Sequence, residues 1–280
     1  MKNSKYNYSK FILQLSTIFT VVSVVFTVFI FISNTKCSFG LSHADVTPTP
    51  TESLPTPTDR EKELTYYFAV KTVNDGNYKA AIPQLLNVVK IDPSQVTAYY
   101  LIGYAYRNLN KTDLAITNYE TYLGRSSPKN QFRISAMIEL GYLYMAKNKH
   151  PLAENIITQA ENEATSSNNE KLNNVKKAIN FIFNSTGYEL MNLNNYPEAK
   201  WRLEKAIKAS DDSYTWANVN LMRLFIRNAE DLFNLHKYPE SKYQLINCKN
   251  LYQNVPAVWK KQTDYLNNRI NKLERKLSYF

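Results

Sequence analysis

The chain has 280 residues and a formal net charge of +10 at pH 7, and 44% of its residues are hydrophobic. It contains only six glycines and two cysteines. A phosphate-cradling loop needs clustered glycines, and a disulfide-stabilised domain needs several cysteines. Composition therefore argues against both, and it allows one sizeable domain with appendages.

The amino-terminal stretch predicts a membrane anchor. Residues 11–32 carry no charge and are long enough to span a hydrocarbon core of ~30 Å. Three lysines precede this stretch: Lys2, Lys5 and Lys10. Because positive charge tends to remain on the cytoplasmic side, we expect a cytoplasmic tail over residues 1–10, a signal-anchor helix over 11–32, and the rest of the chain on the non-cytoplasmic side.

Cleavage of this stretch is the alternative. Small residues around Ser42 and Ala44 have the spacing that a signal peptidase accepts, which would give a secreted or periplasmic protein cut near Ala44. A signal peptide usually has an apolar region of only about 7–15 residues, so a retained anchor is favoured.

Residues 33–60 are predicted to form a linker. Its second half alternates proline and threonine, and proline fixes φ and removes a backbone donor. We expect an extended, semi-stiff spacer between the anchor and the body.

The body, residues 61–255, shows apolar residues at three- and four-residue spacing, which predicts helices throughout. Within it, Gly103, Gly141 and Gly187 each precede a polar break and then an alanine, and Ala69 and Ala229 head two similar segments. Such self-similarity indicates units that bury one another. The predicted units are 62–95, 96–129, 134–167, 180–213 and 222–255.

These units resemble tetratricopeptide repeats (TPR), which are pairs of antiparallel helices of about 34 residues. In that family a small residue late in the first helix lets the second helix approach, and small residues in the second helix permit packing. The matching second-helix positions here are Ala81, Ala115, Ala153, Ala199 and Ser241, followed by Ala160, Ala206 and Cys248. The resemblance implies an all-α, right-handed superhelical solenoid of about five hairpins.

Some features depart from the family pattern. Pro83 falls inside the second helix of the first unit and predicts a kink or fraying, and Tyr122 replaces a small residue in the second unit. Cys248 is expected to be a buried packing residue. Residues 256–280 form an amphipathic helix, which we expect to cap the solenoid because such folds need a terminal element with a polar outer face.

Signals for chemistry are weak. The three histidines, His43, His150 and His236, are isolated, so no metal site is predicted. No nucleophile motif appears, so the chain is predicted to be neither an enzyme nor a cofactor-binding protein. The surplus positive charge is spread over all repeats without a dense basic run, so nucleic-acid binding is not expected. Whether the solenoid self-associates is left open.

The resemblance also implies a partner-binding surface, because the first helices of such repeats line a concave groove. Tyr104, Tyr142 and Tyr188 take equivalent places and could form a tyrosine ladder, or could simply pack between adjacent first helices. The residues predicted to bind a partner are Tyr66, Asn74, Tyr100, Tyr104, Arg107, Asn108, Tyr142, Met145, Asn184, Tyr188, Met191, Asn192 and Phe233.

The predicted function is that of a membrane-tethered, non-enzymatic scaffold that binds a protein or an extended peptide segment in this groove, for example in assembly of a membrane or envelope complex. The alternative is an exported accessory domain of an envelope-polymer system that binds a glycan or an enzyme partner. Tyrosines suit either role, since they offer a large contact area with a polar tip.

Overall fold

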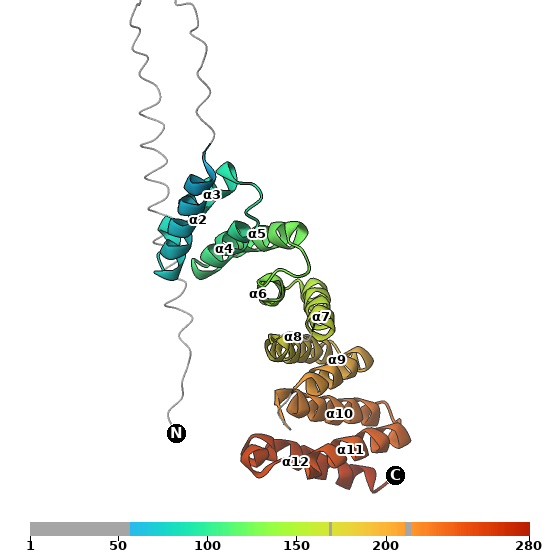
Figure 1. Ribbon diagram of the computed structural model, residues 1–280. Helices are drawn as coiled ribbons and strands as arrows, with labels where there is room; N and C mark the ends of the chain where they lie inside the picture. Colours follow the sequence, from blue (N-terminus) through green and yellow to red (C-terminus); the bar gives the residue numbers. More distant parts are fainter. Residues whose placement is uncertain (1–56, 168–169, 211–213) are drawn as a thin grey trace, which may run out of the picture. The chain divides into compact units, whose positions relative to one another are not determined.

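The computed structural model describes residues 57–167, 170–210 and 214–280, which belong to one compact unit. These residues form eleven helices and no strand (Figure 1). The predicted tail, signal-anchor helix and most of the linker lie outside the described residues, as does the proposed cleavage site. In the ranges that the structure covers, no helix has both the length and the apolar character needed to cross a bilayer.

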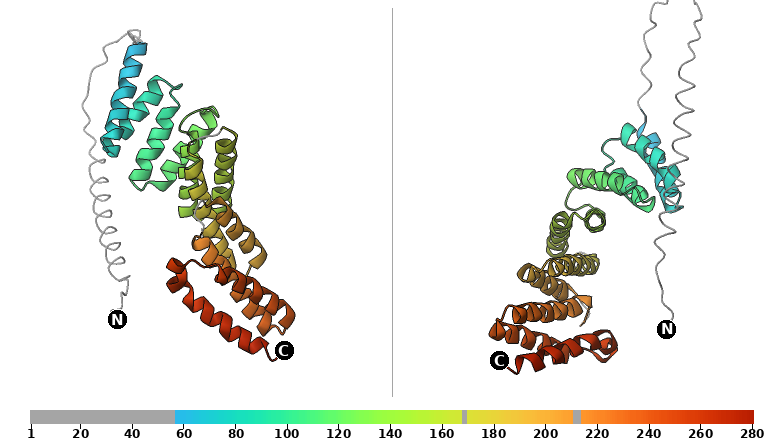
Figure 2. Two further views of the ribbon diagram at one scale, coloured as in Figure 1. Left: turned by 60° about the horizontal axis from the view of Figure 1, so that its bottom comes forward. Right: turned by 180° about the vertical axis from the view of Figure 1, so that it is seen from behind.

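The helices pair into five consecutive hairpins that are followed by one further helix (Figure 2). Each helix packs on its hairpin partner, and each second helix packs on the first helix of the next hairpin. The all-helical hairpin solenoid predicted from the sequence is thus confirmed. The pairs are α2 (Asp59–Asn74) with α3 (Tyr78–Ile91), α4 (Thr97–Asn108) with α5 (Thr112–Arg125), α6 (Arg133–Ala146) with α7 (His150–Ser166), α8 (Leu172–Asn192) with α9 (Tyr196–Ala209), and α10 (Trp216–Asn234) with α11 (Tyr238–Gln253); α12 (Ala257–Leu277) follows them.

All five hairpins turn in the same way. The second residue of each three-residue connection has a positive φ, between 55° and 74°, and the following residue donates its N–H to the carbonyl five residues earlier. This geometry is the Schellman motif, which favours glycine or asparagine at the left-handed position. The residues in that position are Gly76, Asn110, Asn148, Asn194 and His236.

The glycines of the first helices do allow close approach, although not always to the expected partner. A Cβ added to Gly103 would lie 3.1 Å from the Tyr119 ring of α5, and one added to Gly187 would lie 2.9 Å from Leu203 Cγ of α9. At Gly141 the nearest atom belongs to Ile182 of α8, the first helix of the next hairpin. Gly141 therefore serves the contact between hairpins more than the contact within its own.

The small second-helix positions are buried as predicted. Ala81, Ala115, Ala153 and Ala199 are fully buried, and the serine that replaces alanine in α11, Ser241, donates its hydroxyl to the Ala229 carbonyl of α10 at 2.7 Å.

Three residues that depart from the repeat pattern, Cys248, Tyr122 and Pro83, are accommodated in different ways. Cys248 is fully buried, as expected, and burial raises the pKa of its thiol to about 12. Tyr122 is also fully buried and donates to Asn130 Oδ1 at 2.6 Å. The helix that contains Pro83 runs on from Tyr78 to Ile91, so the proline does not end it.

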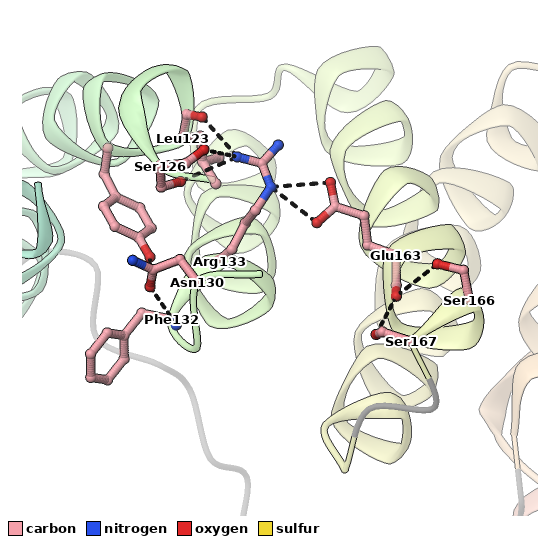
Figure 3. A network of polar contacts seen from close by, with 9 residues as sticks. Leu123, Ser126, Asn130, Phe132, Arg133, Glu163, Ser166 and Ser167 are labelled. Atoms are coloured by element: carbon pink, nitrogen blue, oxygen red, sulfur yellow. Dashed lines mark hydrogen bonds and ion pairs between the residues drawn. The ribbon is translucent and has the colours of Figure 1, made fainter. Parts of the chain in front are cut away.

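Arg133 joins the second hairpin to the third (Figure 3). Its guanidinium donates from Nη1 to the Leu123 carbonyl at 2.8 Å and to Ser126 Oγ at 3.2 Å, near the end of α5. On its other side, Nε lies 3.0 and 3.1 Å from the two carboxylate oxygens of Glu163 in α7. The mostly buried guanidinium thus donates hydrogen bonds to acceptors at the end of the second hairpin and to a carboxylate of the third.

The final helix, α12, packs on both α10 and α11. Its buried stripe is the predicted one, with Leu266, Ile270, Leu273 and Leu277 at most 4% exposed. Its exposed side is polar and charged, and includes Lys261, Asp264, Lys272, Glu274, Arg275 and Lys276. A charged outer face suits an element that ends a solenoid.

Candidate functional site: the first-helix face

We use the name first-helix face for the surface that α2, α4, α6, α8 and α10 contribute, because all the predicted partner-binding residues except the buried Met191 have some exposed area on these helices. Neighbouring first helices pack directly on one another at the α2–α4, α6–α8 and α8–α10 boundaries. Residues from different hairpins therefore meet on this face.

Tyr100 of α4 is largely committed to packing. Its ring stacks on Phe132, just before α6, with centroids 4.8 Å apart and planes at 18°. It also contacts the rings of Tyr119 and Tyr122 in α5. Burial raises the pKa of Tyr100 to about 12. This side chain helps to join two hairpins, with only part of it left for a partner.

An ion pair links α4 to α6 on the same face. Arg107 Nε lies 2.7 Å from Glu139 Oε2, but the pair lacks hydrogen-bond geometry, and that oxygen is buried. Burial raises the pKa of the Glu139 carboxyl, and the Arg107 charge opposes the rise. Behind the pair, the fully buried Tyr119 hydroxyl has no hydrogen-bond partner among the described residues. The region holds polar groups that the fold leaves incompletely satisfied.

Beside Glu139 a cleft of about 280 Å³ opens between α6 and α8. Its walls combine a carboxylate, an ammonium, a hydroxyl and an amide with two larger side chains. Donors and acceptors thus lie together with apolar surface, the mixture that a peptide backbone and its side chains require. The lining residues are Ser135, Ile138, Glu139, Tyr142, Asn174 and Lys177.

The three equivalent tyrosines have different surroundings. Tyr104 makes an edge contact with Tyr78 of α3, with centroids 5.8 Å apart, and Tyr142 makes one with Phe181 of α8 at 5.5 Å. Tyr188 is 41% exposed. Within the described part of the chain no ring contact joins these tyrosines to one another, so they form separate contact points. Their role in partner binding stays a prediction.

The asparagines of α8 connect it to α10. Asn184 Oδ1 accepts a hydrogen bond of 2.8 Å from Asn220 Nδ2, and Asn192 Oδ1 accepts one of 3.1 Å from Arg227 Nη1. Met191 is only 3% exposed and belongs to the core. Two of these three predicted binding residues remain at the surface, and Met191 does not.

Phe233, near the end of α10, belongs to an aromatic cluster. Its ring contacts those of Tyr238 and Phe280 at 5.4 and 5.9 Å, and the Lys276 ammonium lies 5.4 Å from its centroid. Sequence reasoning did not find Phe280, because the residue lies beyond the repeat frame and no pattern links it to α10.

The remaining predicted residues differ in how much of each side chain is exposed. Tyr66 is half-buried, and burial raises the pKa of its hydroxyl. Asn74 is exposed, and Met145 is half-buried against the core. Asn108 donates to the carbonyl of Tyr104 at 2.8 Å, so its amide is already engaged.

A larger cleft, of about 650 Å³, lies between α7, α8 and α9. Trp201, which is 52% exposed, lines it beside Lys205, whose ammonium lies 4.2 Å from the centroid of the Phe183 ring. This cleft was not predicted from the sequence. The sequence does contain one sign of it, since Trp201 and Lys205 are four residues apart and therefore lie on one face of their helix.

Metal ligation finds no support in the residues that the structure describes, since no group of three His, Cys, Asp or Glu side chains could hold an ion there. His150 Nδ1 lies 2.8 Å from Glu189 Oε2, and His236 Nδ1 lies 2.8 Å from the Tyr238 hydroxyl. His43 lies outside the described residues.

Five stacked hairpins with a shared turn, and first helices that contact one another, define an α-hairpin repeat protein. Comparison with known families names the repeat: residues 73–110 match the family described as TPR repeat, and residues 96–127 match the one described as tetratricopeptide repeat. Residues 73–127 are therefore similar to tetratricopeptide repeats. Solenoids of this kind present extended surfaces that suit protein–protein interaction.

Solved structures resemble this one at low sequence identity. The TPR repeats protein from Bacteroides fragilis is 13% identical, with 77% of this chain and 98% of that chain covered, at a TM-score of 0.51. The C-terminal part of a TPR repeat-containing protein from Cytophaga hutchinsonii is 18% identical, with 76% and 77% covered, at a TM-score of 0.42. YrrB, described as a TPR protein with an unusual peptide-binding site, is 16% identical, with 68% and 86% covered, also at 0.42.

At these identities the likeness concerns the fold alone. A comparison with curated protein sequences found no match.

Proposed function

We propose that the repeats act as a scaffold that binds an extended segment of a partner protein along the first-helix face. The observation that carries this proposal is the cleft between α6 and α8, where Glu139, Tyr142 and Lys177 combine both charges with an aromatic surface. The tetratricopeptide repeats support the same role, because proteins built from them generally serve as non-enzymatic scaffolds.

We further propose that residues 11–32 tether this scaffold to a membrane, with the repeats on the non-cytoplasmic side. Support comes from the sequence: an uncharged stretch long enough to cross a bilayer follows a cationic flank. A linker rich in proline then separates the stretch from α2. Such a linker would hold the binding face away from the lipid.

The binding role can be tested by photo-cross-linking in native cells. A photoreactive amino acid replaces Tyr188, which is exposed on the first-helix face, and in a separate variant replaces Tyr243, which is 62% exposed on α11. We expect Tyr188 to yield a defined cross-linked protein that Tyr243 does not. The cross-linked segment of the partner protein, once purified, should bind the full chain. Lys177→Glu or Tyr142→Ala in the full chain should weaken that binding. Identical products at both positions, or a segment that binds both variants unchanged, would refute the proposal.

The tether is tested separately. The mass of the mature chain shows whether cleavage near Ala44 has occurred, and protease added from either side of the membrane shows where the repeats lie. A full-length chain in the membrane fraction, with repeats protected from the cytoplasmic side, is the expected result. A mature chain that begins after Ala44 would show that the repeats are cleaved from the anchor and secreted. The proposed partner binding would be unaffected by that result.

A further inference from the structure

The first hairpin leaves one face of α2 uncovered. Leu64 is 45% exposed, Tyr67 is 61% exposed and Phe68 is 57% exposed. The rings of Tyr67 and Phe68 contact each other edge to face, with centroids 5.7 Å apart. Three large apolar side chains in two turns of one helix make an exposed patch rather than scattered surface residues.

The same repeat positions are buried in the later hairpins. The residues equivalent to Leu64 are at most 1% exposed, and three of the four equivalent to Phe68 are at most 2% exposed. In those hairpins the preceding pair of helices covers the position, for example α2 and α3 against α4. The α2 patch is thus the surface that a preceding hairpin would cover. The buried equivalents are Ala98, Ala136, Ile182 and Leu224 for Leu64, and Ile102, Leu140 and Thr186 for Phe68.

Charges flank the patch in a self-complementary order. Arg60 precedes it and Asp75 follows it, both exposed and neither paired with another described residue. At 3.6 residues per turn, Arg60, Leu64, Lys71 and Asp75 fall along one stripe of the helix, with Tyr67 and Phe68 beside it. Along the sequence, Arg60 and Asp75 are equally far from the point between Tyr67 and Phe68. Leu64 and Lys71 are equally far from that same point.

We infer that a second copy of this chain covers the patch, through an antiparallel, two-fold α2–α2 contact. A two-fold interface needs a surface in which residue i meets j and j meets i. Turning α2 about the point between Tyr67 and Phe68 sets Arg60 opposite the partner's Asp75 and Leu64 opposite the aliphatic stem of the partner's Lys71. The aromatic rings meet at the centre. The contact occurs twice by symmetry.

The other end of the solenoid does not fit this patch. The outer side of α12 is polar and charged, with Lys261, Lys272 and Arg275 among its exposed residues, so a head-to-tail contact would bury charge against aromatic rings. The two-fold contact instead closes as a dimer. This inference does not depend on the proposed partner-binding role, because the patch lies on α2 of the first hairpin, whereas the cleft lies between α6 and α8.

The test uses the full chain and reverses the charges. Arg60→Glu and Asp75→Arg each place like charges opposite each other twice, and the double variant restores attraction. Within one chain the two residues are fifteen positions apart, about 22 Å along a helix, so they cannot pair there. Each single change also favours the helix, since it adds an acid near the amino end or a base near the carboxyl end. A loss of association would therefore not reflect unfolding of α2.

Association is read by disulfide cross-linking of Tyr67→Cys in a Cys37→Ser background, with Tyr243→Cys as the exposed control, and by sedimentation over a range of concentrations. We expect Tyr67→Cys to give a cross-linked dimer and the control to give little. Each single charge reversal should weaken dimerisation roughly fivefold to tenfold, and the double variant should restore it.

Three outcomes would overturn the inference. Equal cross-linking at both cysteines would show contact without a specific interface. A double variant as weak as the single ones would exclude the antiparallel register. If the chain stays monomeric and α2 is protected from hydrogen exchange, the chain's own amino-terminal segment covers the patch. If the chain stays monomeric and lipid vesicles quench the fluorescence of Tyr67, a membrane covers the patch.

Discussion

The ring of Phe280, the last residue, stacks on the ring of Tyr238 at the start of α11, with centroids 3.8 Å apart and planes at 12°. Phe280 also contacts Phe233 of α10. The end of the chain thus folds back over the turn of the fifth hairpin and ties α12 to it.

Removing this ring should loosen the carboxyl-terminal end. We expect Phe280→Ala to lower the free energy of unfolding by about 0.5–1.5 kcal/mol, the usual contribution of an aromatic pair. Tyr279→Ala is the matched control, because Tyr279 is 85% exposed and should change stability by less than about 0.5 kcal/mol. Denaturant unfolding measures both, and equal effects would mean that the stacking contributes nothing.

Two glycines should respond oppositely to alanine. In Gly187→Ala the new Cβ would lie 2.9 Å from Leu203 Cγ and 3.2 Å from the Ala199 carbonyl, so overpacking should cost about 1–3 kcal/mol. At Gly124 nothing lies within 4 Å, and Gly124→Ala should stabilise α5 by up to about 1 kcal/mol. Unfolding midpoints that shift in the same direction would contradict the close approach of α8 and α9.

The Arg133 link should be sensitive to the shape of the cation. Arg133→Met leaves the Glu163 carboxylate and the Leu123 carbonyl without their donor, and should cost about 1.5–3 kcal/mol. Arg133→Lys should recover only part of that loss, because an ammonium cannot reach both sides as a planar guanidinium does. The exposed Lys129, changed to Met, serves as the control in the same unfolding experiment. Full recovery by lysine would show that charge alone matters.

Glu139 should make stability depend on pH. Burial raises the pKa of its carboxyl above its ordinary value of about 4.5, so the folded chain binds more protons than the unfolded chain between the two pKa values. Its contribution is present below the unfolded pKa and is lost as pH rises through the folded one.

Glu139→Gln removes this titration, so the stability of the variant relative to the original chain should increase as pH rises from about 4.5 towards neutrality. Denaturant midpoints across that range measure the difference, with the exposed Glu170, changed to Gln, as the control. Parallel curves for the variant and the original chain would show that the carboxyl is not desolvated.

The helical hairpins could be predicted from the sequence because their determinants are local. Apolar spacing marks each helix, and small residues such as Gly103 and Ala115 recur within one repeat. Even the shared turn has a local signal, since four of the five left-handed positions hold an asparagine or a glycine, although Asn148 and its equivalents were not recognised as such.

The contents of the first-helix face could be predicted only in part. The repeat frame places Tyr104, Tyr142 and Tyr188 on equivalent helix positions. It does not say that Tyr142 meets Phe181 or that Arg107 meets Glu139, because those pairs join separate hairpins.

The sequence by itself therefore determined that this protein is a series of helical hairpins and which residues of each helix face its partner. Only the tertiary structure decided how one hairpin meets the next: that Gly141 accommodates Ile182, that Arg133 reaches Glu163, and that Leu64 and Phe68 are exposed where most of their equivalents are buried. The physical reason is that helix formation depends on neighbours a few residues away, whereas these contacts depend on the angle and distance between elements thirty or more residues apart.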